Sequence, residues 1–237
     1  MFNIRITNKA QNTLAALFVS ITIVVFGFLV MNVVYLTAIS STVDRISSEN
    51  TLDSESYRQF SNSLENEKRR LSFAALVMDI KNVLEIYRPN TGGMNYMDFA
   101  YLIASESFEK GIDPYLVLAV IKTESSFRRH VVSNKGAVGF MQVLPGTAFY
   151  VSDMHENINL GSRSELFDPQ KNIRIGISYL AYLLNKYDNQ KYALIAYNMG
   201  PGNLQKQMRS GGAVSEKYYK AVMYNYERIL RISNRTS

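Results

Sequence analysis

The sequence predicts a mainly α-helical protein, in which one apolar helix precedes a spacer and a compact helical domain. No charged residue lies between Lys9 and Asp44, which indicates a single long apolar segment near the N-terminus. Beyond residue 95, signals for helix starts and ends recur, whereas strand-like alternation is rare. The predicted order is an N-terminus with a transmembrane anchor, a polar and helical spacer, and a folded domain, over residues 1–40, 41–94 and 95–237.

The apolar segment, residues 14–39, is long enough to cross a bilayer, because a spanning helix needs roughly 20 apolar residues. A cleaved signal peptide has an apolar region of only about 7–15 residues. The stretch "YLTAISS" (35–41) does resemble a cleavage site, so a signal peptide remains the alternative. The clearly polar members of the segment are Ser20, Thr22, Asn32 and Thr37. We predict a single-pass anchor in the cytoplasmic (inner) membrane.

The charges before the segment set its orientation. Arg5, Lys9 and the N-terminal amine favour a cytoplasmic N-terminus, which places everything after residue 40 on the extracytoplasmic, periplasmic side. The chain has no cysteine, so disulfides, cysteine-ligated zinc and a lipidated cysteine are excluded. The net charge of +6 is scattered, without a basic motif interleaved with aromatic residues, and nucleic acid is not an expected partner.

A polar, serine-rich stretch over 40–63 leads into a second predicted helix over 64–87. Its apolar residues recur at helical spacing, and the helix either continues away from the membrane or packs on the last domain. Pro89, Gly92 and Gly93 predict a domain boundary within 88–95. The residues of the apolar stripe are Leu64, Leu71, Ala75, Met78, Val83 and Ile86.

The last domain reads as a series of short helices. Asp-Pro pairs at 113–114 and 168–169 supply an N-cap followed by proline at the first helical position. Glycines at 111 and 200 end helices. The stretch 133–148 is rich in loops, and its "AVGFMQV" core has the composition of short strands. Helices are expected over 98–110, from 114 through Glu124, and over 172–187, 191–200 and 216–232.

Residues for metal or nucleophilic chemistry are few. His130 and His155 lie 25 positions apart without a second ligand at helical spacing, so no metal site is expected. No GxSxG elbow supports a Ser–His–Asp triad, and the glycine-rich stretches lack the lysine and spacing of a phosphate loop. Neither a metal nor a cofactor is predicted.

Glu124 ends the predicted helix that contains the apolar run Tyr115–Ile121. Partial burial and the negative end of a helix both disfavour an ionised carboxylate, so both raise its pKa. A raised pKa lets a carboxylic acid donate a proton near neutral pH. Glu124 is therefore a candidate general acid, and a solvated surface glutamate is the alternative.

Four blocks in order carry a resemblance. "ESSF" (124–127), "GFMQVLPGTA" (139–148), "NIRIGISYL" (172–180) and "AYNMGPGNL" (196–204) are followed by Tyr218 and Val222. Together they closely resemble the lytic transglycosylase domain of the soluble-transglycosylase type, a lysozyme-like fold related to goose-type lysozymes. The resemblance covers about residues 96–232 and implies that the predicted domain over 95–237 is catalytic.

This resemblance implies cleavage of the β-1,4 bond between N-acetylmuramic acid and N-acetylglucosamine in peptidoglycan. Glu124 would protonate the glycosidic oxygen and then accept the proton of the muramoyl C6 hydroxyl, which closes a 1,6-anhydro ring without water, metal or cofactor. The implied partners are glycan strands. Residues 41–94 would space the domain from the membrane or contact a partner in a secretion or division assembly.

The same resemblance implies further site residues. Ser133 would contact the substrate near the cleavage point, and Gln142 would line the sugar cleft. The hydroxyl of Tyr197 would lie within reach of Glu124 and help set its protonation. Asn198 would hold the turn and touch substrate, and Tyr179 is assigned either to the cleft or to the core. Phe140 and Met141 also remain open between core and cleft.

One block departs from the family pattern. Many members carry an "ETxxYV" block whose glutamate lies in the cleft, but aligning Tyr218 puts Val214 and Ser215 where Glu-Thr would stand. Glu216 comes two residues late and is not counted as a site residue. Two alternatives stay open: a hydrolase of the same bond, as in goose-type lysozymes, and an inactive scaffold that binds the wall.

Overall fold

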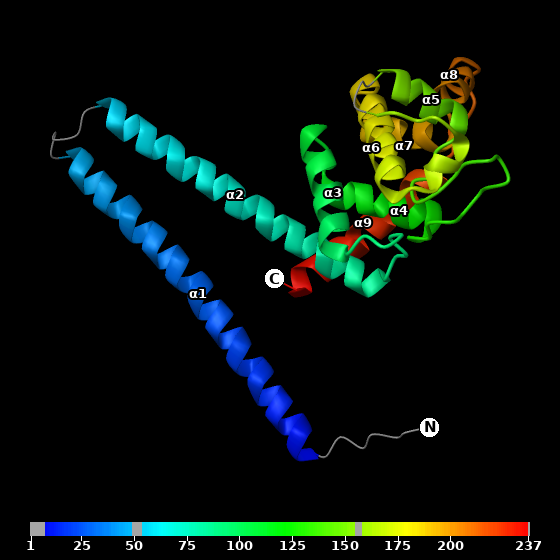
Figure 1. The fold of residues 1–237 in the computed structure, drawn as a ribbon. Helices are drawn as coiled ribbons and strands as arrows, with labels where there is room; N and C mark the ends of the chain where they lie inside the picture. The colour runs from blue at the N-terminus through cyan, green and yellow to red at the C-terminus, as the bar shows by residue number, and fades with distance from the viewer. Residues whose placement is uncertain (1–7, 49–53, 155–157, 237) are drawn as a thin grey trace. The chain divides into compact units, whose positions relative to one another are not determined.

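The computed structural model describes residues 8–48, 54–154 and 158–236, and over these ranges it is mainly helical, as predicted (Figure 1). His155 and Arg5 lie outside the described residues. The chain divides into two compact units, residues 1–68 and 69–237. The elements are α1 (Asn8–Ser48), α2 (Ser54–Tyr87), α3 (Tyr96–Glu109), α4 (Pro114–Ser125), α5 (Pro145–Met154), η1 (Arg163–Phe167), α6 (Pro169–Lys186), α7 (Gln190–Met199), α8 (Pro201–Arg209) and α9 (Lys217–Thr236).

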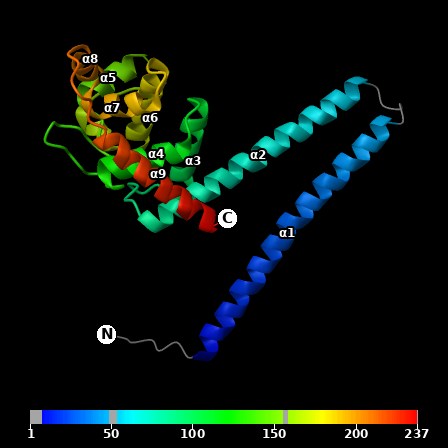
Figure 2. The same cartoon turned by 180° about the vertical axis from the view of Figure 1, so that it is seen from behind.

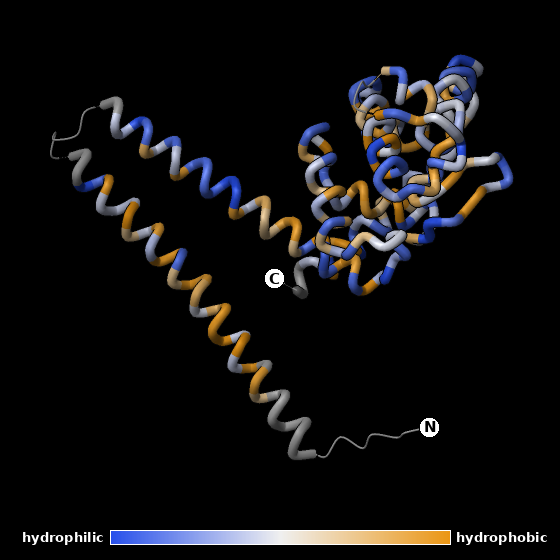
Figure 3. The backbone as a smooth tube through the Cα atoms, in the orientation of Figure 1, coloured by the Kyte–Doolittle hydropathy of each residue, from blue (hydrophilic) through white to orange (hydrophobic). Residues whose placement is uncertain are grey.

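Helix α1 is apolar along most of its length (Figure 3). Its segment Val19–Arg45 has a mean hydropathy of 2.4 and could cross a membrane by length and composition, tests that a signal sequence also passes. Its polar side chains bond back to the helix, because Ser20 Oγ donates to the Leu17 carbonyl at 2.8 Å and Asn32 Nδ2 to the Phe28 carbonyl at 2.7 Å. Such internal pairing is what a helix requires where water is absent.

The second compact unit begins at Arg69, upstream of the boundary that the sequence predicts at 88–95. The reason is that the C-terminal part of α2 belongs to the core. The residues that it buries are Val77, Ile80, Val83 and Leu84. Of the apolar stripe expected from the sequence, Val83 alone is among these buried residues, and Leu71, Met78 and Ile86 are about half exposed. The helix is therefore docked by a face next to the expected one.

A polar cluster reinforces this docking. Asp79 on α2 accepts hydrogen bonds from the hydroxyls of Tyr115, at the start of α4, and Ser233, near the end of α9. At the other end of the docked segment, the ring of Tyr87 stacks on Phe127 with centroids 4.7 Å apart. Residues 69–87 thus contact both ends of α4.

Helix α4 is the central element of this unit. Leu116, Val117, Leu118, Ala119, Val120 and Ile121 form an unbroken buried run, so α4 is covered on nearly every side. Helix α9 packs along it, and the two ribbons lie side by side in opposite views (Figures 1 and 2). Helix α3 also packs on α4, and α6 packs on both α3 and α7. The burial of α4 fixes the place of whatever follows its last turn.

The predicted caps form. Asp113 accepts a hydrogen bond from the Tyr115 amide at 2.9 Å, and Asp168 accepts one from the Lys171 amide at 2.9 Å. Helices α5 and α8 and the turn η1 are not expected from the sequence. Both α5 and α8 begin with Pro-Gly, which reads as a loop signal, although proline suits the first position of a helix.

No named strand occurs in the described ranges; the "AVGFMQV" stretch forms two isolated antiparallel bridges. They pair Val138 with Val132 and with Val143. Phe140 and Met141 are fully buried, which assigns both to the core. The loop is consequently anchored by its apolar side chains and still presents its backbone and polar groups at the surface.

Candidate active site

Glu124 lies at the last turn of α4 with its side chain half-buried. The chain then turns sharply, because Ser126 and Phe127 both adopt left-handed backbone angles, with φ of 53° and 61°. The Ser126 amide closes the helix on the Lys122 carbonyl at 3.1 Å, and Ser125 Oγ donates to the Ile121 carbonyl at 3.1 Å. Phe127 is 2% exposed. The serines and the phenylalanine therefore fix the helix end that carries Glu124.

The carboxyl group of Glu124 is paired with a tyrosine from α9. Tyr218 Oη donates a hydrogen bond to Glu124 Oε1 at 2.6 Å. Burial raises the pKa of Glu124 to about 7, and the bond from Tyr218 opposes part of that rise by favouring the ionised form. Tyr218 itself stays protonated, since burial and the nearby carboxylate raise its pKa well above its usual 10. Glu124 can thus give or accept a proton near neutral pH.

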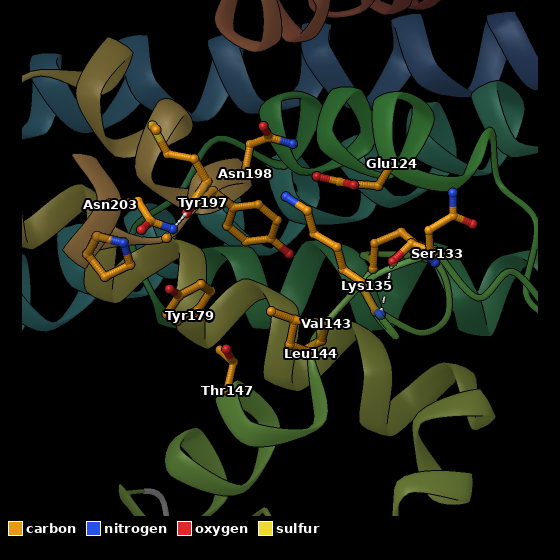
Figure 4. A pocket seen from close by; sticks show the side chains of 16 residues that line it. Glu124, Ser133, Lys135, Val143, Leu144, Thr147, Tyr179, Tyr197, Asn198 and Asn203 are labelled. Atoms are coloured by element: carbon orange, nitrogen blue, oxygen red, sulfur yellow. Dashed lines mark hydrogen bonds between the residues drawn. The ribbon is translucent and has the colours of Figure 1, made fainter. Parts of the chain in front are cut away.

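Glu124 lines a pocket of about 590 Å³. All the other site residues expected from the sequence line the same pocket. They come from the 133–142 loop, α6 and α7, and they are Ser133, Gln142, Tyr179, Tyr197 and Asn198. Figure 4 labels four of them, Ser133, Tyr179, Tyr197 and Asn198, together with Lys135. The contacts of the expected site residues to substrate remain predictions.

Gln142 secures the loop on the pocket wall. Its Nε2 donates to the carbonyls of Val131 at 3.0 Å and Gly139 at 2.8 Å, and its own φ is 49°. The buried Asn172 at the start of α6 braces the same loop by accepting from the Met141 amide and donating to the Val138 carbonyl, each at 2.9 Å. The side-chain amides of Gln142 and Asn172 therefore fix the geometry of this loop.

Two glycines allow the 133–142 loop to lie close to α6. Gly139 has a φ of +80°, and a Cβ there would lie 2.3 Å from Nδ2 of Asn172. A Cβ on Gly176 of α6 would lie 2.4 Å from Sδ of Met141. Any side chain at either position would push the loop away from α6, so these glycines are required by packing.

Tyr197 and Tyr218 make different hydrogen bonds at the site. Tyr197 Oη donates to the Met141 carbonyl at 2.8 Å, and the bond to Glu124 comes from Tyr218. The rings of Tyr179 and Tyr197 lie 5.6 Å apart, and both face the pocket. Burial and the charge of Glu124 raise the pKa of Tyr197, so the expected role of Tyr197 in setting the protonation of Glu124 stays a prediction, beside the direct hydrogen bond from Tyr218.

The α7–α8 turn is held by Asn203, whose Nδ2 donates to the Met199 carbonyl at 2.7 Å. Asn198 is exposed and faces the pocket. Glu216 lines a separate pocket, where its carboxylate pairs with Lys191 at 3.0 Å. Among the described residues, Glu124 is the single carboxylate that lines the pocket.

Over the same residues no group of three or more His, Cys, Asp or Glu side chains is arranged to hold a metal ion. His130 packs against Phe167 with ring centroids 5.5 Å apart. The pocket offers proton transfer by the carboxyl group of Glu124, because burial raises its pKa to about 7.

Residues 101–220 match the family described as Transglycosylase SLT domain. The chain belongs to the SLT family. This confirms the resemblance drawn from the four sequence blocks, and the matched residues include the whole pocket around Glu124.

Curated relatives agree with this membership. This chain is 34% identical over 145 residues to membrane-bound lytic murein transglycosylase C of Actinobacillus succinogenes, covering 57% of this chain and 40% of that protein. It is 37% identical over 97 residues to the soluble lytic murein transglycosylase of Escherichia coli K12, covering 40% of this chain and 15% of the relative. The chain thus spans well under half the length of these relatives.

A solved structure has a similar fold. The 70-kDa soluble lytic transglycosylase in complex with bulgecin A matches with a TM-score of 0.50 and 29% sequence identity, covering 55% of this chain and 24% of that one.

The sequence missed one residue of the site. Tyr218 belongs to one of the sequence blocks, but the sequence assigns it no role, because its partner Glu124 lies 94 positions earlier. No local pattern reports such a pairing, since the packing of α9 on α4 creates it.

Proposed function

We propose that this SLT protein is a peptidoglycan lytic transglycosylase that cleaves between N-acetylmuramic acid and N-acetylglucosamine. The observation that carries the proposal is Glu124, a carboxyl with a pKa of about 7 that faces a pocket and is held by Tyr218. Such a group can act first as an acid and then as a base in one catalytic cycle. The names of the curated relatives support the same reaction.

The contact with Tyr218 separates the two oxygens of Glu124. Oε1 accepts the hydrogen bond from Tyr218, which leaves Oε2 to face the substrate. Protonated Oε2 donates its proton to the glycosidic oxygen as the C1–O bond breaks, and the bonding electrons leave with that oxygen. The carbonyl oxygen of the sugar's acetamido group stabilises C1. The C6 hydroxyl then attacks C1, the acetamido oxygen departs, and Oε2 takes the hydroxyl proton, which restores Glu124.

Other pocket residues would bind and orient the glycan. The hydroxyl of Ser133, the amide of Asn198 and the amide oxygen of Gln142 would offer hydrogen bonds to sugar hydroxyl and acetamido groups. Tyr179 offers an aromatic face on which sugar rings can pack. The loop braced by Asn172 keeps Ser133 and Gln142 in place.

We further propose that α1 anchors the protein in the cytoplasmic membrane with its N-terminus inside, which puts the SLT domain next to the wall. The apolar length of α1 and the internal bonding of its polar side chains support an anchor. Residues 41–68 would act as the spacer, or contact a partner in an envelope assembly, and residues 69–87 would act as part of the domain.

Mass spectrometry of products released from purified wall by the full-length chain in detergent tests the function. Fragments ending in 1,6-anhydromuramic acid are expected from the wild type and absent with Glu124→Gln. Reducing ends that carry one added water would make the protein a hydrolase. Binding to wall with no released sugar, from a folded protein, would make it a scaffold.

A further inference from the structure

Lys135 is the one cationic side chain among the sixteen residues that line the Glu124 pocket in the described part of the chain. Every other lining residue except Glu124 is neutral. Figure 4 shows the Lys135 side chain extending from its loop into the space that Glu124 also faces. A neutral sugar needs no such charge, so Lys135 calls for a different explanation.

The backbone beneath Lys135 is fixed. The Gly136 amide closes a turn on the Ser133 carbonyl at 2.8 Å, and the Ala137 amide donates to Ser133 Oγ at 3.0 Å. The pairing of Val132 with Val138 flanks this turn. An exposed lysine on a rigid turn presents its charge at a defined place, because only its own side-chain torsions remain free.

No ion pair holds the ammonium group of Lys135 within residues 8–48, 54–154 and 158–236. The hydrogen bond of Glu124 comes from Tyr218. Burial keeps the pKa of Glu124 near 7, so Lys135 does not hold this acid in its ionised form. The positive charge is therefore available to a ligand.

We propose that Lys135 and the Ser133–Ala137 turn form a subsite for a carboxylate on the muramic acid side chain of the glycan. This inference rests on the proposed function, which supplies a substrate with such a group. The carboxylate has two sources: the free lactyl group of a peptide-free strand, and the acidic groups of an attached peptide. N-acetylglucosamine carries no carboxylate, so Lys135 would favour muramic acid at this place in the pocket.

Binding assays by calorimetry on full-length Glu124→Gln in detergent test the subsite without needing turnover. The probe is an alternating tetrasaccharide of the two sugars with free lactyl carboxylates, and its matched control carries the same groups as neutral methylamides. Adding Lys135→Met should weaken binding of the acidic probe about 3- to 10-fold, as expected for one partly exposed ion pair. Binding of the neutral probe should not change.

Two further variants separate charge from shape. Lys135→Arg keeps the cation and should retain most of the affinity for the acidic probe. Lys220→Met removes the same net charge from a side chain that is 73% exposed and outside the pocket, and it should leave both affinities unchanged. The preference for the acidic probe should also shrink between about 0.05 and 1 M salt, because screening shortens the range of the charge.

Equal loss for the acidic and neutral probes, or no loss for either, would overturn the subsite. A third probe that carries the peptide distinguishes the two sources: a larger effect of Lys135→Met on it assigns the carboxylate to the peptide, and a larger effect on the peptide-free probe assigns it to the lactyl group. Because the assay reads binding alone, a wall digest without anhydro products would reject the proposed reaction while leaving this result intact.

Discussion

Helices α1 and α4 are both strongly apolar, yet they end in opposite surroundings. The apolar window within Val19–Arg45 of α1 has no buried residue, whereas α4 buries six consecutive residues from Leu116 to Ile121. Length separates them: α1 runs for 41 residues and α4 for 12. A helix of 12 residues rises about 18 Å and cannot cross a bilayer, so its apolar surface must be covered by protein. Apolar composition therefore does not distinguish a membrane-spanning helix from a buried core helix unless the length of the helix is also considered.

The largest difference between α1 and α4 is expected when a leucine near the centre of each helix is replaced by alanine. Leu118→Ala in α4 should lower the free energy of unfolding by about 2–5 kcal/mol, because a fully buried side chain leaves a cavity. Leu29→Ala in α1 should change it by less than about 0.5 kcal/mol, since Leu29 is 58% exposed. Chemical denaturation of both full-length variants in detergent measures this. Similar losses would show that Leu29 is buried as Leu118 is.

A charge in α1 should have a large effect if this helix spans a membrane. Leu29→Arg places a guanidinium near the middle of α1, which costs about 2.5–3.5 kcal/mol in a membrane. Cell fractionation with alkaline extraction should find more of this variant in the soluble fraction than of Leu29→Ala. Equal retention of the two variants would argue against an anchor.

Glu124, at the polar end of α4, should make the stability of the domain depend on pH. The pKa of Glu124 rises from 4.5 to about 7 on folding, so the folded state holds its proton more tightly than the unfolded state. The stability that this provides is complete below pH 4.5 and is lost as pH rises through 7, a loss of about 3 kcal/mol. Glu124→Gln has no such proton. Its advantage over wild type in urea denaturation should grow by about that amount between pH 4 and pH 8; a constant difference would place Glu124 in solvent.

The smallest expected effect concerns the partner of Glu124. Tyr218→Phe removes a hydrogen bond that favours the carboxylate, so the pKa of Glu124 should rise further, by about one unit. A ¹³C NMR titration of the carboxyl measures the shift. Tyr197→Phe is the matched control, because that hydroxyl donates to Met141 and its loss should move the pKa much less. A larger shift in the control would reverse the assignment of the two tyrosines.

What the sequence predicted well is local. Asp113 and Asp168 cap their helices within three residues of themselves, and the end of α4 is formed by the serines and phenylalanine that follow Glu124. What it missed depends on residues far apart. The docking face of α2 and the bond between Tyr218 and Glu124 arise from packing between elements, which no short pattern reports.

The docking of α2 determines where a truncated chain that keeps the folded domain can begin. A chain cut at residue 95 would lose Val77, Ile80, Val83 and Leu84 from the core and would leave the hydroxyls of Tyr115 and Ser233 without Asp79. It would also uncover Phe127, three residues beyond Glu124, by removing the ring of Tyr87. A fusion or transplant that keeps the domain intact therefore has to start at or before Arg69.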